Sequence, residues 1–328
     1  MAKLVAAFGS SHSIMLATQL EDWLHNFRVS DLKLQYFDMQ GEPRSYEEVL
    51  KAAPADLAEK LTDKAVTARY HAVQDAMDHM REAVHAANLD VLLILGDDQY
   101  ELFFDQHMPA LAIYYGETIR NAVRRPVAEG DWFRAGQARR YEEHADRAYP
   151  CHAPLARHLI DALTNDEFDV NAMSGLRDDQ YEGHAFSFIH RRYMPEHVVP
   201  IIPIFLNTYN PPNVPHPSRC VKLGESLKRA IESFPDDMRV GIMASGGLSH
   251  FVVDEPMDRM VFDAIGKKEL EPLNNLDPRI LKAGSSEIRC WIAVANAALD
   301  LDLTWHSYTP GYRTPAGTGT GLGFAVWG

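Results

Sequence analysis

The chain has 328 residues, of which 46% are hydrophobic and 24% are charged, the proportions of an ordinary globular protein. Asp and Glu outnumber Lys and Arg by 46 to 32, and the resulting net charge of −14 argues against a nucleic-acid partner. No apolar run approaches the roughly 20 residues that cross a bilayer, so we expect no membrane segment. The apolar part of the N-terminus is too short for a signal peptide, and a cytoplasmic location is expected.

Cysteine usage argues against two further classes of protein. The three cysteines, Cys151, Cys220 and Cys290, are far apart and form no CxxC pair. A disulfide framework and a thiolate zinc site are therefore not expected, and we interpret all three as buried thiols. The 15 histidines permit a metal site with nitrogen and oxygen ligands, although their number alone does not indicate one.

Strand and helix patterns alternate along the first half of the chain. "KLVAAFGSSHS" is typical of a strand that runs into a polar loop, and "IMLATQLEDWLHNF" has the apolar spacing of a helix. Ser45 and Glu48 form a predicted capping box at a helix start, and residues 54–87 are predicted to form one long helix or two joined ones. "LDVLLILGDDQ" is the second predicted strand, and "ALAIYYGE" is the third.

The second half continues this alternation after a polar, poorly periodic excursion at 130–150. "CHAPLARHLIDALTND" and "VKLGESLKRAIESF" have helical spacing, whereas "FDVNAMSG", "VVPIIPIFLN" and "MRVGIMASGG" are typical of strands. The prolines of "VVPIIPIFLN" suggest an edge strand or a bulge, and the glycine-rich C-terminus ends in one more predicted strand. No repeat or linker divides the chain. We therefore predict a single α/β domain over 1–328, with a central largely parallel or mixed sheet and helices on both faces.

Three predicted strands end in residues that can carry chemistry. "AAFGSSHS" ends near His12, "LLILGDDQY" ends in Asp98 and Gln99, and "VGIMASGGLSH" ends in His250. If these strands are parallel neighbours, their ends meet at the sheet edge where open α/β folds bind ligands. His12 alone can be interpreted as a helix cap, but two such histidines with acids between them favour a functional site. The small residues around them are expected to leave room for a ligand.

Several segments resemble a known family. They are "FGSSHSIML", "GDDQYELFFDQHMPALAI", "GHAFSF", the stretch from 219 to 250, which is the most specific, and "AGSSEIRCWIAVA". In this order they are similar to the class III extradiol ring-cleavage dioxygenases. That family includes the catalytic beta subunit of protocatechuate 4,5-dioxygenase and gallate dioxygenase, and the resemblance covers most of the chain.

The resemblance implies a set of site residues. Members of the family hold a non-haem Fe(II) with two histidines and a glutamate. By position, His12 and Glu287 are the implied metal ligands, and His250 is the implied acid/base beside the bound oxygen. His184 is implied as a second catalytic histidine that hydrogen-bonds a substrate oxygen from a strand-end loop. Tyr100 either stacks on an aromatic substrate or packs under its own loop.

One position departs from the family pattern. The second metal histidine of the family follows an aspartate just past a strand, as in "DHY" or "DHA", and Gln99 stands there in "DDQY". Glutamine is a poorer ligand for Fe(II) than imidazole. Gln99 can ligate weakly or through water, a neighbour (Asp97, Asp98 or Glu101) can supply the missing ligand, or the metal site can be lost. We favour a retained site with Fe(II), and Mn(II) is the second candidate metal.

The resemblance implies extradiol cleavage of a catechol-type ring, of the protocatechuate or gallate kind, by Fe(II) and O2. The expected partners are a small aromatic substrate, O2 and further copies of the chain in a homo-oligomer such as a dimer, because family members form dimers or pair with a small second subunit. Two alternatives stay open: an enzyme on the same scaffold that acts on a phenolic or heterocyclic ring without inserting O2, and a non-catalytic binding protein. Arg191 and Arg192 can pair with a substrate carboxylate or, more plainly, with acidic neighbours on the surface.

Overall fold

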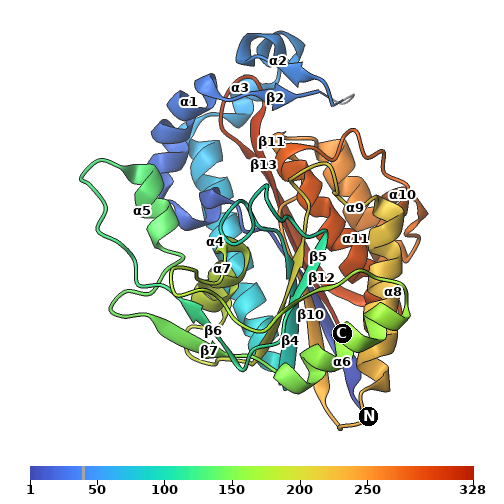
Figure 1. The fold of residues 1–328 in the computed structure, drawn as a ribbon. Helices are drawn as coiled ribbons and strands as arrows, with labels where there is room; N and C mark the ends of the chain where they lie inside the picture. Colours follow the sequence, from blue (N-terminus) through green and yellow to red (C-terminus); the bar gives the residue numbers. More distant parts are fainter. Residues whose placement is uncertain (39–40) are drawn as a thin grey trace.

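A computed structural model of the chain describes residues 1–38 and 41–328 (Figure 1). Within these residues, a mixed nine-stranded sheet has the order β11-β13-β1-β10-β4-β9-β5-β8, and β12 pairs along β13. Its strands are β1 (Lys3–Ser10), β4 (Val91–Gly96), β5 (Leu111–Tyr114), β8 (Asn171–Met173), β9 (Ile201–Leu206), β10 (Arg239–Ser245), β11 (His250–Val252), β12 (Leu303–Tyr312) and β13 (Thr318–Trp327). Two small hairpins lie outside this sheet: β2 (Tyr36–Phe37) with β3 (Pro43–Arg44), and β6 (Thr118–Asn121) with β7 (Arg147–Pro150).

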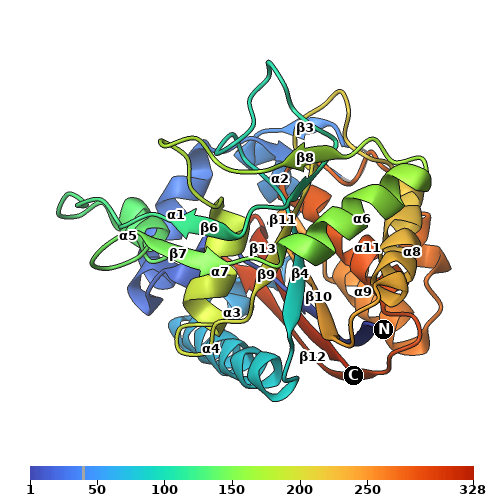
Figure 2. The same ribbon diagram turned by 60° about the horizontal axis from the view of Figure 1, so that its bottom comes forward.

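Helices cover both faces of the sheet, as the sequence predicted (Figures 1 and 2). The helices on one face are α6 (Ala153–Asn165), α8 (Pro217–Ser233), α9 (Glu255–Lys267) and α11 (Ile288–Ala297). The helices on the other face are α4 (Asp63–Ala86) and α7 (His184–Tyr193). The shorter helices are α1 (Phe27–Ser30), α2 (Tyr46–Ala52), α3 (Leu57–Lys60), α5 (Trp132–Ala138) and α10 (Glu271–Asn274). In the described part of the chain, no helix has both the length and the apolar character of a membrane span.

The continuous apolar run of β4 reflects burial on both faces. Leu93 and Leu95 belong to the hydrophobic core under α8 and α11, whereas Leu92 and Ile94 belong to the core under α4 and α7. Successive side chains of a strand point to opposite faces, so a strand between two helical layers must be apolar at every position. This two-sided core holds the central strands rigidly and fixes where their ends lie.

Three strand ends meet at one edge of the sheet, as predicted. β10 pairs in parallel with β1 on one side, where Ser10 faces Ser245, and with β4 on the other. The loops that follow these strands carry His12, Asp97 and His250. Parallel pairing therefore brings three chemically active loops together from distant parts of the sequence.

The C-terminus forms a hairpin of two long strands rather than the single strand that was predicted. β12 and β13 pair antiparallel over almost their whole length, and all but the first residue of the "GTGTGLG" stretch lies inside β13. β13 also pairs with β1, where Ser10 faces Phe324, and with β11, where His250 faces Thr320. Because β1 and β11 pair with successive parts of β13, this one strand aligns the loops of His12 and His250.

Several local predictions are confirmed and others are wrong. The capping box of Ser45 and Glu48 is present, and the helical stretch 54–87 is two helices, α3 and α4. The stretch 130–150 contains α5 and β7 instead of being irregular. The cysteines form no disulfide, although Cys151 is only half-buried.

The strand β9 is central and not an edge strand, although it contains Pro203. β9 pairs with β4 along its length, but its ladder with β5 ends at Ile204. Pro203 therefore lies beyond the β5 ladder and has a strand neighbour on one side only. A proline that lacks an N–H is tolerated at such a position, which the sequence pattern could not distinguish from a true edge.

A close helix contact yields a prediction about stability. A Cβ added to Gly224 of α8 would lie 2.0 Å from the carbonyl oxygen of Ala293 in α11, whereas a Cβ at Gly266 of α9 would meet nothing closer than 3.5 Å. We expect Gly224→Ala to lower the free energy of unfolding by about 1–3 kcal/mol through overpacking. Gly266→Ala should raise it by up to about 1 kcal/mol through helix propensity. Urea unfolding of both variants checks this, and equal effects would contradict the close contact.

Candidate metal centre

Four buried side chains from separate elements meet beyond the strand ends. His12 follows β1 and Asp97 follows β4, while Glu287 ends a short 3-10 turn (Ala283–Glu287) that leads into α11. His184 is the first residue of α7, with Gly183 as its cap, and so does not lie on a strand-end loop as predicted. The exposed fraction is 8% for His184 and 3% or less for the other three residues.

Three of these side chains form a group that can hold a metal ion. His12 Nε2 lies 3.5 Å from Asp97 Oδ1, and His184 Nε2 lies 3.7 Å from the same oxygen. The three atoms lie within 4.8 Å of one another, and none has a hydrogen-bond partner among the described residues. We call His12, Asp97 and His184 the ligand cluster. Buried polar atoms without partners are costly, and two imidazole nitrogens and a carboxylate oxygen suit a divalent metal.

A fourth group lies next to the cluster. Glu287 Oε2 is 3.6 Å from His12 Nε2 and accepts a hydrogen bond of 2.5 Å from the backbone N–H of Gly247. Glu287 is therefore held by the loop that follows β10 while it faces the cluster. Histidine, aspartate and glutamate side chains from four different elements thus converge on one place.

Hydrogen bonds outside the cluster orient both imidazoles. Ser245 Oγ donates to the carbonyl of Ala185 at 2.7 Å, so it accepts from His12 Nδ1 at 2.9 Å. His184 Nδ1 donates to Glu101 Oε2 at 2.7 Å. Each ring therefore carries a proton on Nδ1 and directs Nε2 towards Asp97. This is the arrangement in which a histidine can ligate a metal while a second group holds its ring.

The electrostatics of the cluster favour a cation. Burial raises the pKa of Glu287 to about 8, and the neighbouring Asp97 adds to the rise. Burial likewise raises the pKa of Asp97 above its ordinary value. Burial and the nearby charge of His184 hold the pKa of His12 well below its ordinary value, so that ring is neutral. Two carboxylates that share a dry site repel each other, and a metal ion would relieve that repulsion.

For His184, opposing effects act on the pKa. Burial alone would lower it, but the carboxylates of Glu101 and Asp97 outweigh burial and raise it to about 9. Without a metal, His184 therefore carries a proton on Nε2 at neutral pH. A metal that binds this nitrogen must displace that proton.

The four polar residues after β4 have distinct contacts. Gln99 Nε2 donates to Asp97 Oδ2 at 3.0 Å, so the amide holds the second oxygen of Asp97. Asp98 accepts from the backbone N–H groups of residues 101, 102 and 103 and so caps the loop, while Glu101 holds His184. Gln99 also lines the cavity at the cluster. Among these residues Asp97 supplies the cluster atom, and ligation by Gln99 stays a prediction.

Other predicted residues lie away from the cluster. Tyr100 is 47% exposed and donates to Asp105 at 2.8 Å, and it does not line the cluster cavity. Arg191 pairs with Glu142 at 2.9 Å, and Arg192 pairs with Asp78 at 2.9 Å, which confirms the plainer interpretation of both.

The cluster opens into a cavity of about 270 Å³, which we call the cluster cavity. Aromatic rings form much of its wall, together with two arginines. Its lining includes His12, Phe27, Gln99, Phe133, Arg140, His184, Tyr209, His250, Phe251, Glu287 and Arg313. A cavity of this size with aromatic walls and polar groups at one end suits a small aromatic molecule.

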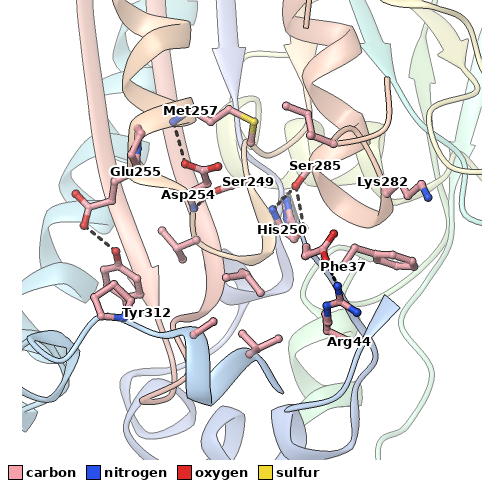
Figure 3. Close-up of a pocket in the computed structure, with 18 of the residues that line it drawn as sticks. Phe37, Arg44, Ser249, His250, Asp254, Glu255, Met257, Lys282, Ser285 and Tyr312 are labelled. Carbon is pink, nitrogen blue, oxygen red and sulfur yellow. Dashed lines mark hydrogen bonds and ion pairs between the residues drawn. The ribbon is translucent and has the colours of Figure 1, made fainter. Parts of the chain in front are cut away.

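His250 lines the cluster cavity and also a larger pocket of about 760 Å³, which Figure 3 shows. Its backbone is held by Ser285 Oγ, which bonds both the N–H and the carbonyl of His250 at 2.8 Å. His250 Nδ1 donates to the carbonyl of Leu248 at 3.0 Å, which leaves Nε2 as the acceptor. Burial lowers the pKa of His250 to about 4, so the ring is neutral at neutral pH.

We expected the small residues near His250 to leave room for a ligand. The glycines there instead allow close packing against the His250 ring. A Cβ at Gly247 would lie 2.0 Å from His250 Cε1, and one at Gly284 would lie 2.2 Å from His250 Cγ. The ring is therefore held between two backbone segments that only glycine permits. A Cβ at the nearby Gly9 would likewise lie 2.4 Å from the ring of Trp291.

Asp258 of α9 anchors the loop that carries His250. Its carboxylate accepts from the backbone N–H of Ser249 at 2.9 Å, from Ser249 Oγ at 2.6 Å and from the hydroxyl of Tyr308 at 2.8 Å. The carboxylate is fully buried, and its hydrogen-bond partners in the described part of the chain include no cation. Asp258 thus holds the residue next to His250, while Ser285 holds the backbone of His250 itself.

Comparison with known proteins identifies the family. Residues 70–275 match the family described as the catalytic LigB subunit of aromatic ring-opening dioxygenase. The chain therefore belongs to this family, within the class III extradiol dioxygenase superfamily that its sequence resembles.

Two curated relatives are similar to parts of the chain. A gallate dioxygenase of Pseudomonas putida is 41% identical over 107 residues, which is 32% of this chain and 30% of that protein. A 2,3-dihydroxyphenylpropionate/2,3-dihydroxicinnamic acid 1,2-dioxygenase of Comamonas testosteroni is 28% identical over 181 residues, 55% of this chain and 49% of that protein. The chain thus spans less than half the length of either relative. A solved structure of an uncharacterized Escherichia coli K12 protein aligns with a TM-score of 0.42 and 12% identity, over 77% of this chain and 92% of that one.

Sequence reasoning missed Arg140, which lines the cavity, and Ser245, which orients His12. Arg140 lies in the stretch that lacked periodicity, and nothing in its sequence neighbourhood indicated a site. Ser245 is an ordinary strand residue by pattern, and its contact with His12 depends on pairing between distant strands. Tyr209, from the proline-rich loop after β9, also lines the cavity.

The buried Asp258 gives a prediction about pH and stability. Burial raises the pKa of its carboxyl from 3.8 to about 6. The native state therefore keeps a proton that the unfolded chain has already lost, so stability falls as pH rises from about 4 to about 6, by up to about 3 kcal/mol. We expect the unfolding free energy of wild type minus that of Asp258→Asn to fall across this window. Urea unfolding at several pH values measures it, and a constant difference would contradict the burial of the charge.

Proposed function

We propose that the chain is a non-haem Fe(II)-dependent extradiol dioxygenase that opens a catechol-type ring, of the protocatechuate or gallate kind, with O2. The observation that carries the proposal is the ligand cluster: three buried ligand atoms without hydrogen-bond partners among the described residues face one another, and His12 and His184 line a cavity with aromatic walls. Membership of the ring-opening family and relatives named for gallate and for dihydroxyphenylpropionate support it.

The proposed metal ligands are the three residues of the cluster, His12, Asp97 and His184, with Glu287 beside them. Asp97 takes the place that the sequence resemblance gave to Gln99. Gln99 then acts through Asp97 by holding its second oxygen. Because this set contains two carboxylates, Mn(II) is the second candidate metal.

The proposed chemistry divides between the metal and the protein. Bound Fe(II) would supply O2 activation and would make the hydroxyl groups of the ring more acidic. His250, which is neutral and presents Nε2 as an acceptor, takes a proton from a substrate hydroxyl and later returns one. Ser285 positions that ring by fixing its backbone, and Gly247 and Gly284 do so by packing closely against it.

His184 has a second candidate role. Because Glu101 keeps a proton on its Nδ1, its Nε2 can either ligate the metal or, when protonated, donate to a substrate oxygen. The aromatic side chains Phe133, Tyr209 and Phe251 line the cavity and would stack on or enclose the ring and exclude water. A cytoplasmic homo-oligomer such as a dimer is part of the same proposal.

Oxygen uptake tests the activity directly. We expect protein loaded anaerobically with Fe(II) to consume O2 and form a yellow ring-opened product with protocatechuate, gallate or another catechol. His250→Phe should lower kcat by at least about 100-fold without loss of iron, because it removes the proton acceptor. His216→Phe, an exposed position outside the cavity, is the matched control and should leave kcat unchanged.

The outcomes separate the alternatives. No oxygen uptake with any catechol would contradict the dioxygenase. Conversion of a phenolic or heterocyclic ring without oxygen uptake would indicate the divergent enzyme instead. A protein that binds aromatic compounds but converts none of them would indicate the binding protein.

Metal affinity tests which residue after β4 is the ligand. We expect Asp97→Asn to weaken Fe(II) binding by at least about 10-fold, because it removes a charged cluster atom. Gln99→Leu should change it by less, since the amide only orients Asp97. Anaerobic equilibrium dialysis with iron analysis measures both. The reverse order of effects would return the ligand role to Gln99.

A further inference from the structure

We infer that Arg140 recognises a carboxylate on the substrate, so that the cluster cavity selects catechols that bear an acidic substituent. The inference rests on the proposed function and names the side chain that would set its substrate class. The inference depends on which arginines in and around the cavity already form ion pairs with carboxylates of the protein.

Two arginines line the cluster cavity, and they differ in their partners. Arg313 is paired with Asp31 at 3.3 Å, where both side chains are at most 4% exposed, and its guanidinium lies 4.2 Å from the ring centre of Phe27. Within residues 1–38 and 41–328, Arg140 has no carboxylate within 4.0 Å. Arg313 is thus ion-paired inside the protein. Arg140 has no such pair, and the carboxylates of Glu101, Glu287 and Asp97 act on its charge only from beyond ion-pair distance.

The guanidinium of Arg140 is held in place but has free donors. One terminal nitrogen donates to the backbone carbonyl of His12 at 2.9 Å, while Nε is buried and without a partner among the described residues. An arginine does not lose its proton in a protein, and a buried cation without an anion is unfavourable. Its planar fork of N–H donors matches a carboxylate, which it can bind through two parallel hydrogen bonds.

The acids around the cluster already have partners. Glu101 accepts from both the backbone N–H and Nδ1 of His184, and Glu287 accepts from Gly247. Asp97 accepts from Gln99 and faces the proposed metal. Arg140 is therefore the cation of the cavity that is available to an incoming anion.

Arg140 also borders a second, shallower pocket of about 340 Å³, where other arginines gather. Those side chains are engaged: Arg139 donates to the carbonyl of Ala17, and Arg191 and Arg192 form the ion pairs with Glu142 and Asp78 described above. The carboxylate-binding role that the sequence allowed for Arg191 or Arg192 thus moves to Arg140, the arginine that the two cavities share.

Calorimetry with matched ligand pairs tests the inference. Anaerobic Fe(II)-loaded protein is titrated with protocatechuate, gallate and dihydroxyphenylpropionate, each against its own neutral carboxamide. We expect at least one acid to bind about 10- to 100-fold more tightly than its carboxamide, as a charge-assisted pair should. Arg140→Gln should abolish this preference, while the binding of the carboxamides changes little.

Two further variants separate recognition from charge and from folding. Arg140→Lys keeps the charge without the planar fork and should keep part of the preference. Arg192→Gln makes the same charge change at an ion-paired position outside the cluster cavity and should keep all of it. Iron content and circular dichroism show whether each variant keeps an intact site. If Arg140→Gln does not fold, the inference is tested by the acid preference of wild type and of Arg140→Lys.

Equal affinity of wild type for every acid and its carboxamide would overturn the inference, as would an undiminished preference in Arg140→Gln or no binding of any acid. Oxygen uptake is measured separately with the same ligands. Turnover of catechols without an acid preference would leave the dioxygenase standing and remove the role of Arg140. An acid preference without oxygen uptake would keep that role and contradict the dioxygenase.

Discussion

The mutual repulsion of two buried carboxylates, Asp97 and Glu287, is the constraint on which the rest of the site depends. Neither has an arginine or lysine within ion-pair distance among the described residues, and both face the same imidazole of His12. A protein can keep such a pair ionised only by adding positive charge or by holding a proton between them. The end of β4 positions Asp97 and the 3-10 turn before α11 positions Glu287, so the fold itself holds the two carboxylates where positive charge is needed.

The groups behind the cluster suggest how the site can hold a glutamine at the position where the sequence resemblance implies a histidine. Ser245, Glu101 and the N–H of Gly247 each hold one cluster side chain in a single orientation. Gln99 does the same for Asp97. In the proposed site this position serves orientation instead of ligation, because the side-chain amide of glutamine is a poor metal ligand but a good hydrogen-bond donor to a carboxylate.

The parts of the fold that follow from local pattern were predictable, and the parts that follow from distant pairing were not. The apolar run of β4 indicated a buried strand, and its polar end indicated a site. The sequence does not show the direction of each side chain where the strand ends. It therefore could not tell which of Asp97, Asp98 and Gln99 faces the cluster. Arg140 escaped notice because its stretch has no period, and the C-terminal hairpin did because its glycines resemble those of a loop.

The alignment of two loops by β13 has a consequence for biosynthesis. β1 is made first, but its partner β13 lies near the other end of the chain, and β11 depends on β13 as well. During translation the chain can therefore form β1, β10 and β4 as a parallel core before β13 is present to align the loops of His12 and His250. The site matures only when the final strand is added to the sheet, so a nascent or C-terminally shortened chain would be folded in its centre yet without a completed pocket.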